Sequence, residues 1–343
     1  MKIGITLHPY GEKKPAGLGR AVFDITKSLL EVDRENEYAI FLKNPNLKPD
    51  LPGSNWKTSP LTLSAIRSLD VCIFNTPILP WWYGFFGRAK KSIVIAYDFA
   101  YLQFSPNFFL KWYHGYSLRR ADVIISISEA TKKEIIKIFK IPEKKIKVVY
   151  LGYQKICPMP PKEISGLPEK FFFFVGAIKE RKNVLGIVKA FSIFKKNNYT
   201  NHTLVIAGNG RGAYYEKIIK FVESNNLKND IIFLGHITDH ELSYLYKKAE
   251  VLLYPSFIEG FGFPVLEAMD CGLPVITSNA SSLPEVAGDA ALLVDPYHVK
   301  EISDAMQNIT AHQNLRSDLV KKGYEQVKKF SWQKTGTEIL HLL

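Results

Sequence analysis

The stretch VLLYPSFIEGFGFPVLEAMDCGLPVIT, from Val251 to Thr277, decides how this sequence folds. Two short apolar runs, Val251–Tyr254 and Pro274–Thr277, have the length of buried strands and enclose a loop and a helical segment. Pro264 suits the first turn of that helix, which we expect to run to about Asp270. The stretch therefore predicts a strand–helix–strand unit of a parallel sheet.

Two glutamates flank the glycine-rich part of this stretch. In a single helix, Glu259 and Glu267 would lie about two turns apart on one stripe. Gly260 and Gly262 break such a helix, so Glu259 is expected in a loop and Glu267 one turn into the helix that follows. Both carboxylates can then face one ligand lying across the helix N-terminus.

Apolar runs alternate with helical patterns along the rest of the chain, and this alternation predicts parallel sheets covered on both faces. The expected strands of the first series are Lys2–Leu7, Tyr38–Leu42, Val71–Phe74, Ser92–Tyr97, Val123–Ile127 and Ile146–Tyr150, with helices at Arg20–Leu30, Leu110–Arg120 and Glu129–Phe139. The remaining strands of the second series are Phe171–Val175, Thr203–Ala207, Ile231–Leu234 and Ala291–Val294. We predict an α/β protein of two Rossmann-like domains that face each other across a ligand-binding cleft.

The length of the chain and the positions of its prolines and glycines indicate the domain borders. A chain of 343 residues is more than one core usually holds, and Cys157–Lys170 contains the prolines and the glycine of a linker. We expect a first domain over residues 1–160, a linker over 161–170 and a second domain over 171–330. No apolar run reaches 18 residues, and the chain starts with a strand-like segment, so neither a membrane-spanning helix nor a signal peptide is expected.

The cysteines give a weaker indication. Cys72, Cys157 and Cys271 are odd in number, lie far apart and lack the spacing of metal ligands. We therefore expect reduced cysteines in a cytoplasmic protein.

The positive charge of the chain is concentrated in its first half. Of the net +12, residues 1–165 carry +11, with 25 Lys and Arg against 14 Asp and Glu, whereas residues 166–343 carry +1, with 20 against 19. A lysine-rich proteome explains a high overall pI but not this asymmetry, which favours an anionic partner of the first half. Nucleic acid is not the expected partner, because no nucleic-acid-binding motif accompanies the charge.

Three loops between a predicted strand and a predicted helix have the composition of anion-binding loops. Gly17 and Gly19, in GEKKPAGLGRAVFDI, allow close backbone approach before a helix, although such glycines often serve the turn alone. Arg181 and Lys182, in GAIKERKN, suit a diphosphate beside helix amides, and an ordinary solvated charge cluster is the alternative. Gly208, in GNGRG, fits either a ligand contact or a plain turn.

Together these motifs resemble the retaining glycosyltransferases of family 4, which have the GT-B fold. The second half carries the resemblance through VGAIKERKNVLGIVKAF, LVIAGNG, IIFLGHITDHELSYLYKKAEVLLYPS, IEGFGFPVLEAMDCGLPVITSN and SSLPEVAGDAALLVDP. The first half matches more loosely, through PAGLGRAVFDITKSLL and VIAYDFAYLQFSP. The resemblance also implies that residues 331–343, which include FSWQKTGTEIL, form a terminal helix that crosses back to the first domain.

The resemblance implies a role for each residue of a donor site. Glu259 would contact the hydroxyls of the donor sugar and stabilise positive charge at the anomeric carbon, and Glu267 would hold the ribose. Arg181 and Lys182 would neutralise the leaving diphosphate in place of a metal ion, so no metal and no further cofactor are expected. The residues that would line the sugar, the phosphate and the base are Gly260, Phe261, Gly262, His236 and Ile237.

The donor implied by the resemblance is a GDP- or UDP-hexose. The segment SSLPEVAGDAALLVDP is similar to the corresponding segment of mannosyltransferase-like members, which favours GDP-mannose. Two positions depart from the family. Gly176-Ala177 stands where many members have an arginine after the glycine, and Tyr97-Asp98 stands where they often have His-Asp. Tyrosine can donate a hydrogen bond to a sugar, but it does not titrate near neutrality.

The resemblance implies that the acceptor binds the first domain, as it generally does in GT-B enzymes. Its segment Pro77–Lys91 mixes Trp81, Trp82, Tyr83, Phe85 and Phe86 with Arg88, Lys90 and Lys91. This composition fits contact with an anionic membrane, and burial of the rings in a core is the alternative. We expect a peripheral enzyme that extends a glycan or a lipid-linked glycan at the inner face of the cell membrane.

Other functions remain open from the sequence. A GT-B protein that binds a nucleotide-sugar or a glycan without transferring it is the main alternative, supported by Tyr97. A nucleotide-sugar epimerase or a phosphorylase would share the architecture, but the chain lacks recognisable pyridoxal-site features.

Overall fold

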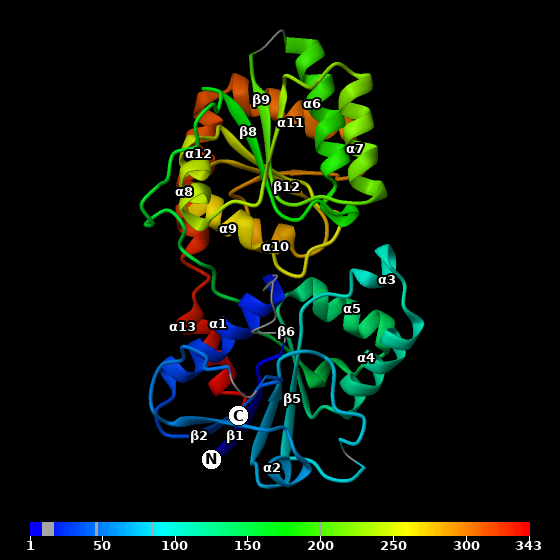
Figure 1. Ribbon diagram of the computed structural model, residues 1–343, viewed down its shortest axis with the longest axis vertical. Helices are drawn as coiled ribbons and strands as arrows, with labels where there is room; N and C mark the ends of the chain where they lie inside the picture. Colours follow the sequence, from blue (N-terminus) through cyan, green and yellow to red (C-terminus); the bar gives the residue numbers. More distant parts are fainter. Residues whose placement is uncertain (9–16, 45–46, 84, 199–200) are drawn as a thin grey trace. The chain divides into compact units, whose positions relative to one another are not determined.

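The computed structural model describes residues 1–8, 17–44, 47–83, 85–198 and 201–343. The chain divides into two compact units (Figure 1). The first comprises Met1–Gly152 and Phe330–Leu343, and the second comprises Tyr153–Lys329. No helix of the described residues is long and apolar enough to cross a membrane.

The first unit contains a parallel sheet with the strand order β3-β2-β1-β4-β5-β6-β7 among the described residues. Its strands are β1 (Lys2–Thr6), β2 (Glu37–Phe41), β3 (Trp56–Ser59), β4 (Val71–Phe74), β5 (Lys91–Ala96), β6 (Val123–Ser126) and β7 (Ile146–Val148). Its α-helices are α1 (Gly17–Val32), α2 (Leu63–Arg67), α3 (Tyr101–Phe104), α4 (Phe108–Arg120), α5 (Glu129–Phe139) and α13 (Trp332–Leu340). The sequence did not predict β3, because its WKTS segment has no apolar pattern and lies half-exposed at the sheet edge.

The C-terminal helix α13 belongs to the first unit because close contacts fix it there. It packs against α1, where a Cβ on Gly336 would lie 2.4 Å from the carbonyl oxygen of Ser28. Its Thr335 hydroxyl donates to the carbonyl of Tyr150 at 2.9 Å and accepts from the Gly152 amide at 3.0 Å. The chain therefore returns to its first unit after completing the second.

The second unit contains a parallel sheet with the strand order β10-β9-β8-β11-β12-β13 among the described residues. Its strands are β8 (Phe171–Val175), β9 (Thr203–Ala207), β10 (Ile231–Gly235), β11 (Val251–Tyr254), β12 (Val275–Ser278) and β13 (Leu292–Val294). Its α-helices are α6 (Val184–Asn198), α7 (Ala213–Ser224), α8 (Asp239–Lys248), α9 (Phe263–Asp270), α10 (Leu283–Ala287), α11 (Val299–Ala311) and α12 (Gln313–Val327). Central strand β8 is apolar on both faces, with Phe171–Phe174 fully buried, as expected of a parallel sheet covered by helices on both sides.

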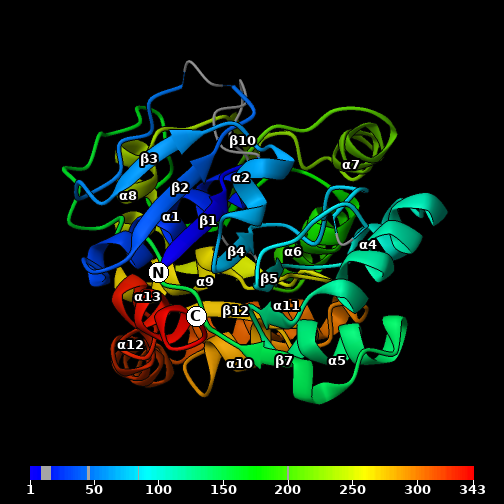
Figure 2. The same ribbon diagram turned by 90° about the horizontal axis from the view of Figure 1, so that it is seen from below.

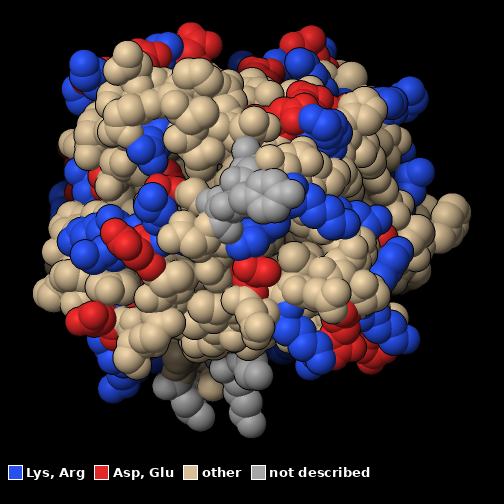
Figure 3. Space-filling view, turned by 90° about the horizontal axis from the view of Figure 1, so that it is seen from above, with Lys and Arg blue, Asp and Glu red and all other residues tan. Residues whose placement is uncertain are grey.

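Each unit is thus Rossmann-like, as the sequence predicted. The predicted bounds of β4, β8, β9, β11 and α5 are those of the structure, and most other predicted elements differ by only a few residues at their ends. In Figure 3, Lys and Arg lie among Asp and Glu on the face that is drawn, without a broad field of one sign.

The cysteines correct one expectation. Cys157 and Cys271 form a disulfide, with their Cα atoms 5.4 Å apart, although 114 residues separate them. The expectation of reduced cysteines is therefore wrong for this pair, because folding brings the start of the second unit to the end of α9. Cys72 is a free, buried thiol in β4, and burial raises its pKa.

Candidate active site

The loop from Pro255 to Gly262 joins strand β11 to helix α9 at the carboxyl end of the second sheet. Gly262 caps the helix with φ +121°, a conformation that favours glycine, and Pro264 follows in the first turn. Ser281 and Ser282 fix the loop from the next strand–helix connection, as both hydroxyls donate to the Glu259 carbonyl, at 2.7 and 2.9 Å. These hydrogen bonds therefore hold the backbone of the loop in place at Glu259.

Glu259 lies in direct contact with the two cations that the sequence associated with a diphosphate. Its carboxylate accepts from Lys182 Nζ at 2.5 Å and from Arg181 Nη1 at 3.1 Å. Arg181 also donates to the carbonyl of Ile258 at 3.0 Å, and the Phe257 amide donates back to the Arg181 carbonyl at 2.9 Å. The structure thus joins the loops after β8 and β11 into one charged cluster.

The charged side chains of this cluster are largely buried. The side chains of Glu259 and Lys182 are only 6% and 11% exposed, whereas Arg181 is 27% exposed. Burial acts to raise the pKa of Glu259, but the charges of Lys182 and then Arg181 outweigh it, so this pKa is lowered. Two cations beside one buried carboxylate are a suitable setting for an anionic ligand.

Two buried tyrosines complete the surroundings of the two glutamates. The Lys182 ammonium donates to the Tyr254 hydroxyl at 2.5 Å and lies 4.9 Å from the centre of that ring. The Tyr246 hydroxyl donates to Glu267 Oε2 at 2.9 Å, and this hydrogen bond orients one carboxylate oxygen of Glu267 on α9. Burial, followed by the neighbouring carboxylate, raises the pKa of each tyrosine well above its ordinary value.

Glycines line the carboxyl ends of the neighbouring strands. A Cβ on Gly208 would lie 1.8 Å from the carbonyl oxygen of Gly176, and its φ is +142°, so only glycine fits. The Gly208 amide donates to the carbonyl of Gly235 at 2.7 Å, which ties the ends of β9 and β10 together. His236 is exposed and Ile237 half-buried in the turn that follows β10, and their contact with a base stays a prediction.

The remaining donor-site predictions lie on α9 or its preceding loop. Gly260 is buried, and Phe261 is 3% exposed with its ring 5.4 Å from the ring of Phe263. The Phe261 side chain therefore belongs to the core, and only its backbone is left for a ligand. A Cβ on Gly262 would lie 2.7 Å from Leu283 Cδ2, which gives that glycine a packing role as well.

In the first unit, the predicted residues lie at the carboxyl ends of β1 and β5. Tyr97 is partly buried, and its hydroxyl has no hydrogen-bond partner within the described parts of the chain. Its carbonyl accepts from Thr131 Oγ1 at 2.9 Å, and Asp98 accepts from the Ala100 amide at 3.1 Å. Burial, and then the charge of Asp98, raises the pKa of Glu134, a nearby acid that the sequence did not single out.

The first predicted glycine loop lies largely outside the described residues, which omit residues 9–16. Of its predicted positions, Gly17 is exposed at the start of α1 and Gly19 is buried in the first turn. Their contact with a ligand stays a prediction.

Sequence reasoning missed the residues that hold the site together. Asn183 adopts φ +56° and donates to the carbonyls of Pro255 and Pro296, at 3.1 and 2.7 Å. Asn183 follows Arg181-Lys182 directly. Because asparagine tolerates the left-handed conformation, its presence here could have predicted a turn between the strand and the helix. Ser281 and Ser282 offered no such signal, because their partners lie about 20 residues away along the chain.

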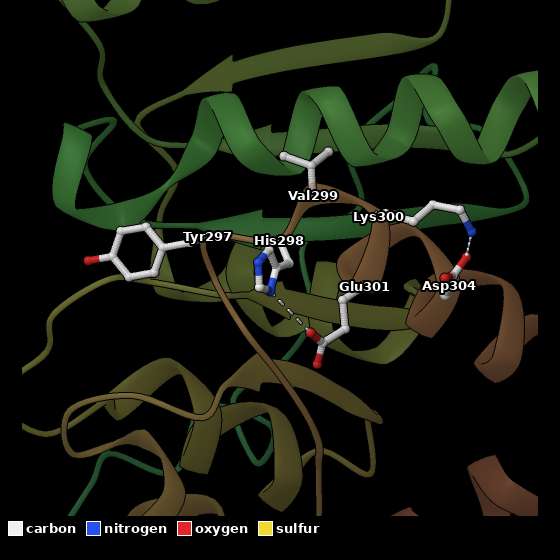
Figure 4. A pocket seen from close by; sticks show the side chains of 6 residues that line it. All are labelled: Tyr297, His298, Val299, Lys300, Glu301 and Asp304. Carbon is white, nitrogen blue, oxygen red and sulfur yellow. Dashed lines mark hydrogen bonds and ion pairs between the residues drawn. The ribbon is translucent and has the colours of Figure 1, made fainter.

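A separate surface pocket lies at the start of α11, lined by Tyr297, His298, Val299, Lys300, Glu301 and Asp304 (Figure 4). In this pocket Lys300 pairs with Asp304, and the His298 ring nitrogen lies 4.0 Å from a carboxylate oxygen of Glu301 and 3.1 Å from one of Asp295. The pocket does not include the Arg181–Lys182–Glu259 cluster. We therefore assign the candidate site to the cluster and not to this pocket.

Comparison with known proteins gives the family. A model of the Glycosyltransferase Family 4 domain matches residues 22–154, and one described as Glycosyl transferases group 1 matches residues 159–326. O-antigen chain mannosyltransferase B of Escherichia coli is 34% identical over 233 residues, which are 66% of this chain and 61% of that protein. O-antigen chain mannosyltransferase RfbU of Salmonella typhimurium is 31% identical over 64% of this chain and 61% of its own length. The matched region thus spans about three fifths of these relatives.

Solved structures support the architecture. The crystal structure of Anabaena Alr3699/HepE in complex with UDP has a TM-score of 0.77 with 16% identity, covering all of this chain and 99% of that one. At this identity the likeness shows the fold alone. Because the two family models together cover most of the sequence, the chain belongs to the group 1 glycosyltransferases and has the GT-B fold.

Proposed function

We infer that the protein is a retaining glycosyltransferase that moves a hexose from a nucleoside diphosphate sugar to a glycan or lipid-linked glycan. The observation that carries this proposal is the contact of Glu259 with Arg181 and Lys182 beside the N-terminus of α9. Cations at this place can take up the charge of a leaving diphosphate. In this proposal the buried carboxylate stabilises the positive charge that develops on the sugar.

The proposed reaction breaks the bond between the anomeric carbon and the diphosphate oxygen and forms one to an acceptor hydroxyl on the same face of the sugar. The acceptor proton passes to an oxygen of the departing phosphate. Arg181 and Lys182 stabilise the new charge on that phosphate, which is why we propose a metal-independent reaction and no further cofactor. Glu267 holds the ribose, with one oxygen oriented by Tyr246.

Mannose is the proposed sugar, because two relatives are named as O-antigen mannosyltransferases. GDP is the proposed nucleotide, and the UDP in the complex of Alr3699/HepE makes UDP-sugars the first alternative. We place the reaction in the cytoplasm, at the inner face of the cell membrane.

A panel of nucleotide sugars tests the proposal. Purified protein is incubated with GDP-mannose, UDP-glucose and UDP-N-acetylglucosamine together with mannosyl or lipid-linked acceptors, and nucleoside diphosphate release is followed. We expect release that depends on the acceptor and is unchanged by a metal chelator.

The alternative is a GT-B protein that binds without transferring. It is favoured by Tyr97, whose hydroxyl has no hydrogen-bond partner among the residues that the structure describes. Tight binding of a nucleotide sugar with no release on any acceptor would support that alternative. Release that requires an added divalent ion would contradict the metal-independent mechanism.

A further inference from the structure

Six large aromatic side chains of the first unit are more than half exposed, and they come from two neighbouring segments. They are Trp81 (68%), Phe85 (65%), Phe86 (56%), Phe108 (85%), Phe109 (70%) and Trp112 (56%). We call these six residues, with Tyr113 and Tyr116, the ring patch. Contiguous apolar exposure of this kind marks an interaction surface, unlike singly scattered apolar residues.

Ring contacts join the two segments into one surface. On α4, Phe109, Trp112, Tyr113 and Tyr116 follow the i, i+3, i+4, i+7 spacing of one helix stripe. The rings of Phe109 and Tyr113 are 6.1 Å apart at 7°, and those of Tyr113 and Tyr116 are 6.2 Å apart at 8°. Tyr116 then stacks on Phe85 at 6.4 Å.

The stripe faces outward because α4 uses its other side for the core. His114, Gly115, Ser117 and Leu118 are the buried residues of this helix. Helix α4 lies on the outer side of the first unit, away from strands β1 and β2, in both Figure 1 and Figure 2. In the predicted segment Pro77–Lys91, by contrast, Tyr83 is 1% exposed and Trp82 packs against the core. The sequence therefore assigned the contact to a segment of which only part is exposed.

Cations border the ring patch. The Arg120 guanidinium lies 4.2 Å from the ring centre of Phe85 and 5.0 Å from that of Tyr116. Lys111 and Arg119 are exposed on the same helix, which contains no acidic residue. Rings beside cations suit the headgroup region of a bilayer, where the rings enter the interface and the cations attract anionic lipid.

From this combination we propose that the ring patch docks the protein on an anionic lipid bilayer. The proposal rests on the proposed function, because it would bring the first unit to a lipid-linked acceptor. A glycan is the less suitable occupant. Phe108 and Phe109, the two most exposed rings of the patch, have no polar group to bond a sugar hydroxyl.

Vesicle sedimentation of the full chain tests the surface. We expect binding to vesicles of phosphatidylcholine with about one third phosphatidylglycerol, weaker binding to phosphatidylcholine alone, and loss at high salt. Phe108→Ser with Trp112→Ser should weaken binding more than about tenfold, because both side chains leave the interface. Lys111→Gln with Arg119→Gln should weaken it about fivefold per charge, on anionic vesicles only.

Matched controls change the same residue types elsewhere. Tyr297→Ser removes a ring of intermediate exposure (63%, against 85% for Phe108 and 56% for Trp112) from the second unit, and Lys217→Gln with Lys220→Gln removes two exposed cations from α7. Both should bind vesicles like the wild type. Thermal unfolding of every variant shows whether the fold is intact. Brominated lipids should quench wild-type tryptophan fluorescence, and the quenching should fall in Trp112→Phe.

Three results would overturn the proposal. The first is that the ring variants and the control variants sediment equally with vesicles. The second is that the protein binds mannan through the ring patch but does not bind vesicles. The third is that the protein is a dimer in solution and the ring substitutions dissociate it. The proposed transferase is tested separately. With a water-soluble acceptor, the ring variants should release nucleoside diphosphate as the wild type does. If the wild type itself released none with such an acceptor, the proposed function would be contradicted, and not the docking surface.

Discussion

At the scale of single residues, the site depends on a balance of charge around Glu259. The carboxylate lies in a dry setting and stays ionised because Lys182 and Arg181 contact it. Breaking a buried pair typically costs about 3–5 kcal/mol because a charge is left unpaired. Glu259 is therefore expected to contribute to stability as well as to chemistry.

This balance predicts a pH dependence. A carboxyl whose pKa is lowered on folding stabilises the folded state above its unfolded pKa, about 4.3 for glutamate, and loses that contribution as pH falls through the lower folded value. The stability difference between wild type and Glu259→Gln should therefore be constant near neutral pH and shrink below about pH 4. Urea unfolding at a series of pH values measures it, with Glu216→Gln on the exposed surface of α7 as the control. A difference that grew as pH fell would contradict the lowered pKa.

At the scale of elements, the sequence predicted what local patterns encode and missed what tertiary contacts decide. The four-phenylalanine run of β8 has the composition of a buried strand, and Gly262 with Pro264 indicates the start of α9. The ring stripe on α4 was not recognised as a surface, because such spacing normally marks the side that faces the core. Which side of a helix is buried depends on its neighbours in the fold.

The short 3₁₀ turn Glu180–Lys182 between β8 and α6 supports a prediction about nucleotide binding. Arg181→Gln removes one partly exposed cation and leaves Lys182 to neutralise Glu259. Because a charged hydrogen bond is worth about 1.5–3 kcal/mol, GDP should bind at least tenfold more weakly, whereas guanosine should bind as before. Calorimetry with both ligands measures this, and Lys179→Gln, two residues away and exposed, is the matched control. Equal losses for GDP and guanosine would indicate structural damage.

At the scale of the whole chain, two features could be predicted and two could not. Alternating strands and helices predict two Rossmann-like units, and the spacing of Glu259 from Glu267 directs attention to one loop and its helix. The direct contact between Glu259 and Lys182 could not be predicted, because it joins loops 77 residues apart in the chain. The pairing of Cys157 with Cys271 could not be predicted for the same reason.

The most direct test of the account separates binding from turnover in one variant. Glu259→Gln keeps the shape of the side chain but removes the counter-charge of Lys182 and Arg181. Measured with saturating GDP-mannose, transfer should fall by about a hundredfold or more, as is typical when a stabilising electrostatic contact in the transition state is lost. In the same variant, calorimetry should show GDP bound as tightly as by the wild type, or more tightly. Near-wild-type turnover in a folded Glu259→Gln protein, or loss of GDP binding with the same substitution, would contradict the central role of this carboxylate.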